Sequence, residues 1–167
     1  MNATELIIRP ADSRDASALA EIYNDAIRNT VATFDTEPKT SDERRQWLET
    51  HGERQPILVA EKGGVVVGWA SLSLWSDRCA YADTGETSFY VRSENRGESV
   101  GRRLMEAIIM EARRHQYHTL IARITEGSVA SLRLHDGAGF GRIGTMKEVG
   151  RKFGKLLDVH LLQMMLP

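Results

Sequence analysis

One segment limits the possible folds more than any other: a strand-like run, a short loop with two glycines, and a long amphipathic stretch. Residues 87–92 have the composition of a strand, and glycines follow at positions 97 and 101. From Val100 to about His115, apolar side chains recur at helical spacing: Leu104, Ala107, Ile108 and Ala112. The N–H groups at the start of such a helix attract phosphate. The segment therefore predicts either an anion site at a helix start or a plain strand–turn–helix with a solvated basic rim.

The other expected elements lie on both sides of this unit. Strands are predicted at residues 6–9, 57–61, 65–74, 119–124, 142–149 and 157–166, and helices at about 13–27, 40–51 and 128–136. This order mixes hairpins with strand–helix units, which favours an α+β fold with a mixed, mostly antiparallel central sheet flanked by helices. A length of 167 residues suits a single domain, 1–167.

Composition excludes several classes of partner. A formal net charge of −1 gives no general electrostatic reason to bind nucleic acid or an anionic membrane. The single cysteine, Cys79, excludes a disulfide within the chain and a cysteine zinc cluster, and the pair His115 and His118 lacks a third ligand, so we expect no metal. We find neither an apolar run of membrane-spanning length nor a signal-peptide pattern, so we expect a cytoplasmic protein.

The loop at residues 96–101, Arg-Gly-Glu-Ser-Val-Gly, resembles the Arg/Gln-x-x-Gly-x-Gly/Ala loop of GNAT-type N-acetyltransferases. In that superfamily the loop amides hold the coenzyme A pyrophosphate and the preceding strand pairs with the pantetheine arm. The resemblance implies acetyl-CoA as co-substrate, bound by Phe89, Tyr90, Val91, Arg96, Gly97, Glu98, Ser99, Val100, Gly101, Arg102, Ser128 and Ser131. Ser99 replaces the usual glycine; if its φ is negative, we expect weaker or shifted binding and not its loss. Ser128 replaces a common asparagine.

Five further stretches, in order over some 125 residues, resemble the phosphinothricin and methionine sulfoximine acetyltransferase branch of that superfamily: 34–38, 75–81, 86–91, 131–140 and 150–158. The resemblance implies a substrate pocket formed by Phe34, Thr36, Trp75, Arg78 and Tyr81. An arginine fork suits a carboxylate or phosphinate, and a tyrosine hydroxyl can join it. The alternatives are that Arg78 and Tyr81 are surface residues and that Trp75 is a core residue. Ser76 and Ala82 replace cations of the branch, which favours a less acidic substrate.

Acetyl transfer to an amine requires a group that takes a proton from the ammonium, because an ammonium has no lone pair. Glu86, at the start of the central strand and near the expected thioester, is the candidate general base. The alternative is an exposed glutamate at a strand edge. His135 is the candidate second acid or base, since the pKa of histidine lies near neutral pH. The alternative is a histidine packed at a helix C-terminus.

The leading hypothesis is an N-acetyltransferase that acetylates the amine of a small amino-acid-like substrate by direct transfer in a ternary complex. Cys79 lies outside these roles, so we expect no acetyl-cysteine intermediate. An acetyltransferase for protein N-termini or another amine is the second hypothesis, and a non-catalytic acyl-CoA-binding module is the third. The resembled branch forms homodimers, and the apolar residues 161–166 suggest a buried sheet edge, so we expect a homodimer with the active site near the subunit boundary.

Overall fold

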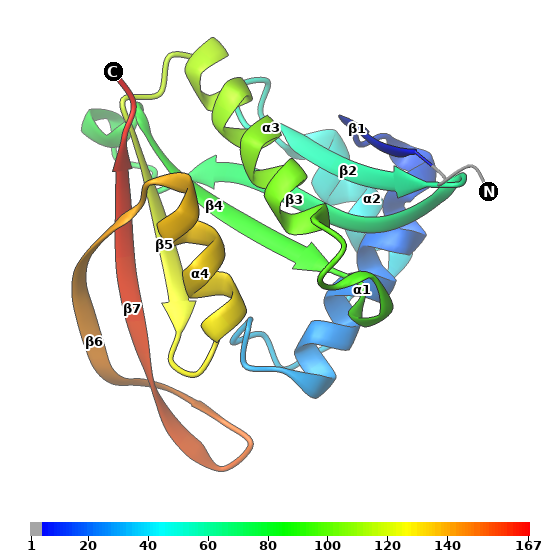
Figure 1. Ribbon diagram of the computed structural model, residues 1–167. Helices are drawn as coiled ribbons and strands as arrows, with labels where there is room; N and C mark the ends of the chain where they lie inside the picture. The colour runs from blue at the N-terminus through cyan, green and yellow to red at the C-terminus, as the bar shows by residue number, and fades with distance from the viewer. Residues whose placement is uncertain (1–4) are drawn as a thin grey trace.

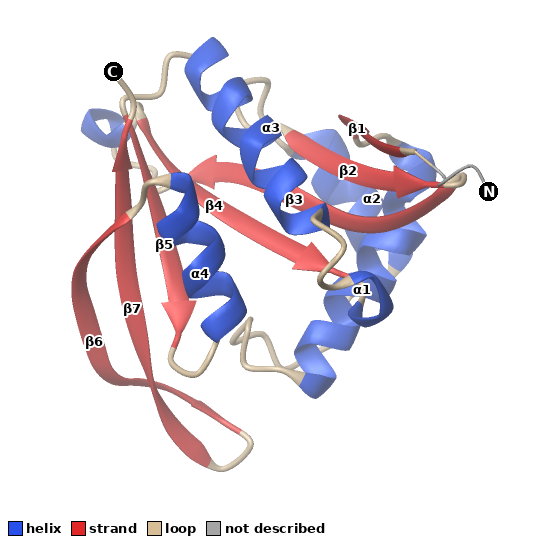
Figure 2. Cartoon of the chain, in the orientation of Figure 1, coloured by secondary structure: helices blue, strands red, loops and turns tan. Residues whose placement is uncertain are grey.

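The computed structural model of the protein describes residues 5–167, so residues 1–4 of the expected domain lie outside the described part. Seven strands form one sheet in the order β1-β2-β3-β4-β5-β7-β6 (Figure 2). The strands are β1 (Leu6–Pro10), β2 (Ile57–Lys62), β3 (Val65–Leu74), β4 (Thr84–Val91), β5 (Thr119–Thr125), β6 (Gly141–Lys152) and β7 (Lys155–Met165). All neighbours are antiparallel except β4 and β5. The expected mixed, mostly antiparallel sheet is confirmed.

Four helices cover the two faces of the sheet: α1 (Ala16–Asn29), α2 (Ser41–Thr50), α3 (Val100–Arg114) and α4 (Val129–Ala138). Figure 1 shows α3 and α4 on one face and α1 and α2 on the other. Strand β2 is buried on both sides, because Leu58 joins the core under α3 and Val59 joins the core under α1. Within residues 5–167, no helix is both long and apolar enough to cross a membrane.

Local capping signals define where the first helices begin. Thr40 accepts a hydrogen bond from the Glu43 N–H, while the Glu43 carboxylate accepts one from the Thr40 N–H, which is a complete capping box. Asp12 caps the short helical turn that leads into α1. Both starts were expected from the sequence.

Strands β4 and β5 are paired along only three residues. Thr84–Glu86 lie opposite Thr119–Ile121, and beyond that point β4 pairs only with β3 and β5 only with β7. Figure 1 shows the two strands diverging below this contact, with α4 in front of the space between them. Beyond Glu86, the backbone N–H and C=O groups on the facing edges of β4 and β5 therefore do not pair with each other. They remain available to an extended partner that carries hydrogen-bonding groups.

Two expectations about strands need correction. Strand β4 begins at Thr84 and not at residue 87, so Glu86 lies inside the strand and not at its start. The apolar residues 161–166 were expected to form a buried edge, but β7 lies between β5 and β6, and β6 is the outer strand. Leu162 and Met164 are buried because their side chains pack into the core that also holds Leu104 and Ile108 of α3.

We predict that Leu104→Ala lowers the free energy of unfolding by about 2–5 kcal/mol, since it leaves a cavity in a close-packed core. Leu104 is 0% exposed and joins α3 to the sheet. Met110 lies on the same helix but is 67% exposed, so Met110→Ala is the matched control and should change stability by less than about 0.5 kcal/mol. Urea denaturation measures both; equal losses would contradict this account of the core.

Candidate active site

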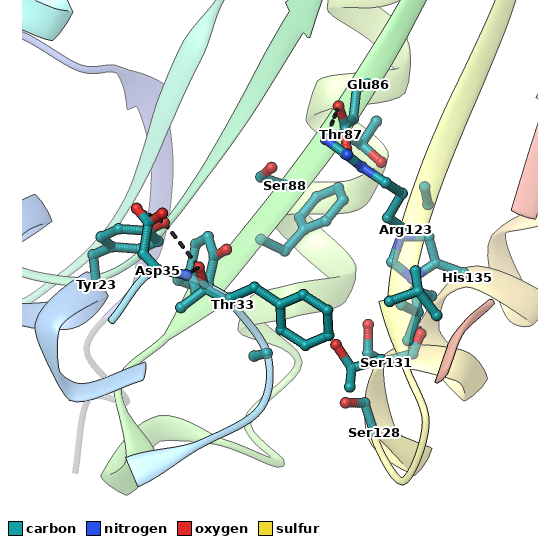
Figure 3. Close-up of a pocket in the computed structure, with 18 of the residues that line it drawn as sticks. Tyr23, Thr33, Asp35, Glu86, Thr87, Ser88, Arg123, Ser128, Ser131 and His135 are labelled. Carbon is teal, nitrogen blue, oxygen red and sulfur yellow. Dashed lines mark hydrogen bonds and ion pairs between the residues drawn. The ribbon is translucent and has the colours of Figure 1, made fainter. Parts of the chain in front are cut away.

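A cavity of about 550 Å³ opens where β4 and β5 diverge. Its walls come from six parts of the chain: α1, the loop after it, β4, β5, α4 with the residue before it, and the β6–β7 hairpin. Figure 3 labels several of the polar residues that line it: Tyr23, Thr33, Asp35, Glu86, Thr87, Ser88, Arg123, Ser128, Ser131 and His135. The volume is in the range of small-molecule pockets.

Glu86 lies where β4 and β5 stop pairing, and its carboxylate forms an ion pair there. The Arg123 guanidinium binds its carboxylate with two hydrogen bonds, one from Nε to Oε1 and one from Nη2 to Oε2 at 2.7 Å (Figure 3). Glu86 pairs with Ile121 across the parallel contact, so Arg123, two residues further along β5, projects from the same face. The Glu86 side chain is 16% exposed. It is therefore not the exposed edge glutamate of the alternative interpretation.

Arg123 was missed in the sequence analysis. It is the exposed residue of a strand, Thr119–Thr125, whose other six residues are buried. A lone arginine within a run of apolar and threonine residues was the available signal, because such a residue must point into solvent or into a polar site. Its guanidinium also lies 5.7 Å from the centre of the Trp75 ring.

His135 is buried against neighbouring rings and also lines the cavity. It is 3% exposed, and its ring makes edge contacts with Phe89 and Phe140. The ring Nδ1 lies 2.8 Å from the Ser131 carbonyl oxygen, so Nδ1 carries the hydrogen and donates it. The Nε2 atom is then an acceptor, and it has no hydrogen-bond partner within the described residues. Burial lowers the pKa of His135, so the ring is neutral at neutral pH.

The wall opposite α4 is a polar cluster on α1 and the loop that follows it. The Tyr23 hydroxyl donates to the Asp35 carboxylate at 2.7 Å and lies 2.9 Å from Thr33 Oγ1. Tyr90 meets the Tyr23 ring edge-on, and the buried Arg44 guanidinium stacks 4.2 Å from the centre of that ring. Burial raises the pKa of both tyrosines, which remain neutral hydrogen-bond donors at neutral pH.

The β6–β7 hairpin fastens this loop over the cavity. Lys152, 5% exposed, donates through Nζ to the carbonyl oxygens of Thr30 and Thr33, both at 2.7 Å. The Phe34 ring lies directly on Gly150, where a Cβ atom would overlap it. Residues 150–154, which belong to one of the motifs matched in the sequence, therefore hold the loop after α1 in place and close one side of the cavity.

The loop at residues 96–102 lies outside the cavity lining, at the start of α3. The Arg96 N–H donates to the Ser93 carbonyl at 3.4 Å, and the next N–H group with a backbone partner is that of Arg103, which donates to the Ser99 carbonyl at 3.0 Å. The N–H groups just before Arg103 are those that every helix start leaves unpaired. Ser99 has a φ of 64°, in the left-handed region, and Gly97 a φ of 81°. The negative φ considered for Ser99 is therefore wrong: the serine adopts the glycine conformation.

The predicted site residues divide into two groups. Glu86 and His135 line the cavity together with Phe34, Phe89, Tyr90, Ser128 and Ser131. The remaining ones lie outside its lining: Thr36, Trp75, Arg78, Tyr81, Val91, Arg96, Gly97, Glu98, Ser99, Val100, Gly101 and Arg102. Arg78 and Tyr81 are exposed on the loop between β3 and β4.

Cys79 is a free, exposed thiol outside the cavity lining. Within residues 5–167, no three histidine, cysteine, aspartate or glutamate side chains are grouped so that they could hold a metal ion.

Comparison with known proteins places this geometry in context. The acetyltransferase (GNAT) domain model matches residues 8–161. The chain is 39% identical to the L-methionine sulfoximine/L-methionine sulfone acetyltransferase of Salmonella typhimurium over 165 residues, covering 96% of this chain and 95% of that protein. It is 36% identical to the phosphinothricin N-acetyltransferase of Streptomyces coelicolor, covering 93% of both.

Solved structures agree in fold over almost the whole chain. An acetyltransferase from Salmonella typhimurium with its cofactor acetyl-CoA superimposes with a TM-score of 0.95 at 38% identity, covering 99% of this chain and 95% of that one. The ribosomal-protein-alanine N-acetyltransferase of Brucella melitensis superimposes with a TM-score of 0.93 at 42% identity, covering 96% and 99%.

We predict that Ser99→Gly raises the free energy of unfolding by about 0.5–1 kcal/mol, because a left-handed backbone costs a residue with a Cβ atom more than it costs glycine. Ser93 begins a helical turn and has no positive φ, so Ser93→Gly should lower stability and serves as the matched control. Chemical denaturation gives both values. Calorimetry should show that Ser99→Gly binds coenzyme A at least as tightly as the wild type, and weaker binding would contradict the role given to this loop.

The stability of the protein should fall between pH 7.5 and pH 5. The pKa of buried His135 is lowered from 6.5 in the folded state, so the unfolded chain takes up the proton first as the pH drops through about 6.5. The contribution of neutral His135 to stability is fully present above that pH and is lost as the pH falls further. Burial also lowers the pKa of His51, so His51 adds to the same loss of stability. His135→Gln should reduce the slope of melting temperature against pH, whereas His118→Gln, on an exposed residue, should leave it unchanged.

Proposed function

The chain belongs to the GNAT acetyltransferase family and is an N-acetyltransferase that uses acetyl-CoA, and we propose that its acceptor is the amine of a small amino-acid-like molecule. The observation that carries this proposal is the polar cavity with Glu86 at the end where β4 and β5 pair. Its size suits a molecule such as methionine sulfone or phosphinothricin, which the named relatives acetylate.

We place coenzyme A along the divergence of β4 and β5. The N–H groups at the start of α3, helped by the helix dipole, suit the diphosphate. The free edge of β4 beyond Glu86 can pair with the amide groups of the pantetheine arm, and Ser128 and Ser131 face the same cavity from α4. This arrangement supports a thioester beside Glu86.

The transfer then needs one proton acceptor at the amine. Glu86 takes a proton from the acceptor ammonium, the amine nitrogen bonds to the thioester carbonyl carbon, and the C–S bond breaks. The second proton leaves the nitrogen and ends on the coenzyme A sulfur, so that an amide and a thiol are formed. His135 presents a bare Nε2, and we assign it as a proton or hydrogen-bond acceptor and not as the donor to sulfur.

An acetyltransferase for protein N-termini is the second candidate, favoured by the likeness to the Brucella melitensis enzyme. A peptide needs an open groove, whereas here Phe34 rests on Gly150 and Lys152 binds the loop after α1. This closure supports the small-molecule acceptor.

We also propose that the enzyme is a homodimer. Apolar side chains of the β6–β7 hairpin are strongly exposed, with Ile143 at 56%, Val149 at 52% and Phe153 at 59%. A second copy on this face would lie near the cavity, because Val149 also lines it. The cytoplasmic location and the absence of nucleic acid or membrane partners stay predictions from the sequence.

The test is a thiol-release assay with acetyl-CoA against methionine sulfone, methionine sulfoximine, phosphinothricin, free amino acids and N-terminal peptides. We expect the small amino acids to be preferred, with Glu86→Gln slowing kcat by about 10²–10⁴-fold because the proton acceptor is lost. His135→Ala should slow it by tenfold or more. Glu49→Gln, on the exposed face of α2, is the control and should match the wild type.

Other outcomes select the other hypotheses. Faster release with peptides than with every free amino acid would favour the protein N-terminal enzyme. Coenzyme A binding by calorimetry without any release would leave only the acyl-CoA-binding module.

A further inference from the structure

The Glu86–Arg123 ion pair places a negative and a positive group side by side at the end of the cavity where β4 and β5 pair. The two side chains come from neighbouring strands and project from the same face of the sheet. Each is the other's charged partner in this structure. A ligand that enters here meets both charges together.

Arg123 is the one cationic side chain among the described residues that line this cavity. The other charged side chains that line it, Glu86 and Asp35, are acidic, and burial lowers the pKa of His135 so that its ring is neutral. Lys152 lies outside the lining and uses its Nζ on two backbone carbonyls. Arg78, the cation expected from the sequence, is exposed on the loop after β3. An anionic group inside the cavity therefore has Arg123 as its partner.

The Glu86–Arg123 ion pair can be replaced by ion pairs to a ligand. The Arg123 side chain is 53% exposed, so solvent screens its attraction to Glu86 and the pair is weak. The Trp75 ring, 5.7 Å from the guanidinium, offers the cation a second surface along which it can shift. Arg123 can thus leave Glu86 without losing every favourable contact.

We propose that the Glu86–Arg123 pair binds the two opposite charges of a zwitterion, and that Arg123 selects acceptors with a carboxylate beside the amine. The ammonium of a free α-amino acid binds Glu86 and its carboxylate takes the Arg123 fork, so two ion pairs replace one. The amine is then held against the group that removes its proton. An amine without the carboxylate has to compete with Arg123 for Glu86. This inference rests on the proposed function and narrows its substrate class to free α-amino acids.

The experiment compares L-methionine sulfone with its carboxamide, which has the same side chain and amine but no carboxylate. For the wild type we expect kcat/KM to favour the acid by about 10–100-fold, the usual worth of hydrogen bonds between charged groups. Arg123→Gln should lower kcat/KM for the acid by a similar factor, chiefly through KM, and leave the carboxamide unchanged or faster. Arg123→Lys should fall between, because lysine keeps the charge but lacks the fork.

Arg113→Gln is the matched control, since Arg113 is exposed on α3 and outside the cavity lining. It should behave as the wild type with both acceptors, and calorimetry with coenzyme A should show that Arg123→Gln still folds and binds. Equal losses for acid and carboxamide in Arg123→Gln would show that Arg123 only positions Glu86, and a preserved preference would show no contact with the carboxylate. Either result overturns the inference while acetyl transfer stands. No thiol release by the wild type with either acceptor overturns both proposals.

Discussion

The separation of β4 from β5 after three paired residues is the constraint on which the rest of the structure depends. Strand β5 keeps β7 as its partner along its whole length, so the strand is stable without β4 beyond Ile121. The space that opens is the cavity, and the last paired residue of β4, Glu86, lies at one end of it. The same separation frees the backbone edge of β4 for an extended ligand and allows α4 to bring His135 against Phe89. In the proposed arrangement, the donor and acceptor sides of the reaction thus meet at one point of the sheet.

Several groups around this point are held in costly states. His135 has a buried Nε2 without a partner among the described residues, Lys152 is a buried cation whose hydrogen bonds go to two backbone carbonyls, and Ser99 has a left-handed backbone. Each would be more stable in another setting, since unpaired buried polar groups and positive φ angles raise the free energy of the folded state. All three lie in or beside the proposed acetyl-CoA and acceptor sites. Where such costs gather, a requirement of function is the usual cause.

The resemblance and the structure contributed different halves of the site. The matched motifs predict the donor side, because a loop that binds a diphosphate with backbone N–H groups is a local feature of consecutive residues. The proposed acceptor side depends on residues from β4, β5, the loop after α1 and the β6–β7 hairpin, which are distant in the chain. There the expected cation, Arg78, is exposed outside the cavity, and Arg123 faces the cavity in its place. The contacts of Lys152 and Gly150 likewise join segments that no short motif describes.

The amino-acid sequence by itself determined the elements and their order, because periodicity, capping at Asp12 and Thr40, and glycine turns act over a few residues. It also placed Glu86 and His135 among the candidates. Only the tertiary structure decided that β4 starts at Thr84, that β7 lies inside the sheet, and that Ser99 takes a left-handed backbone. It alone paired Arg123 with Glu86, 37 residues away, and Lys152 with Thr30, 122 residues away. Contacts at such separations arise from the register of the strands and the packing of the loops, which a local pattern does not encode.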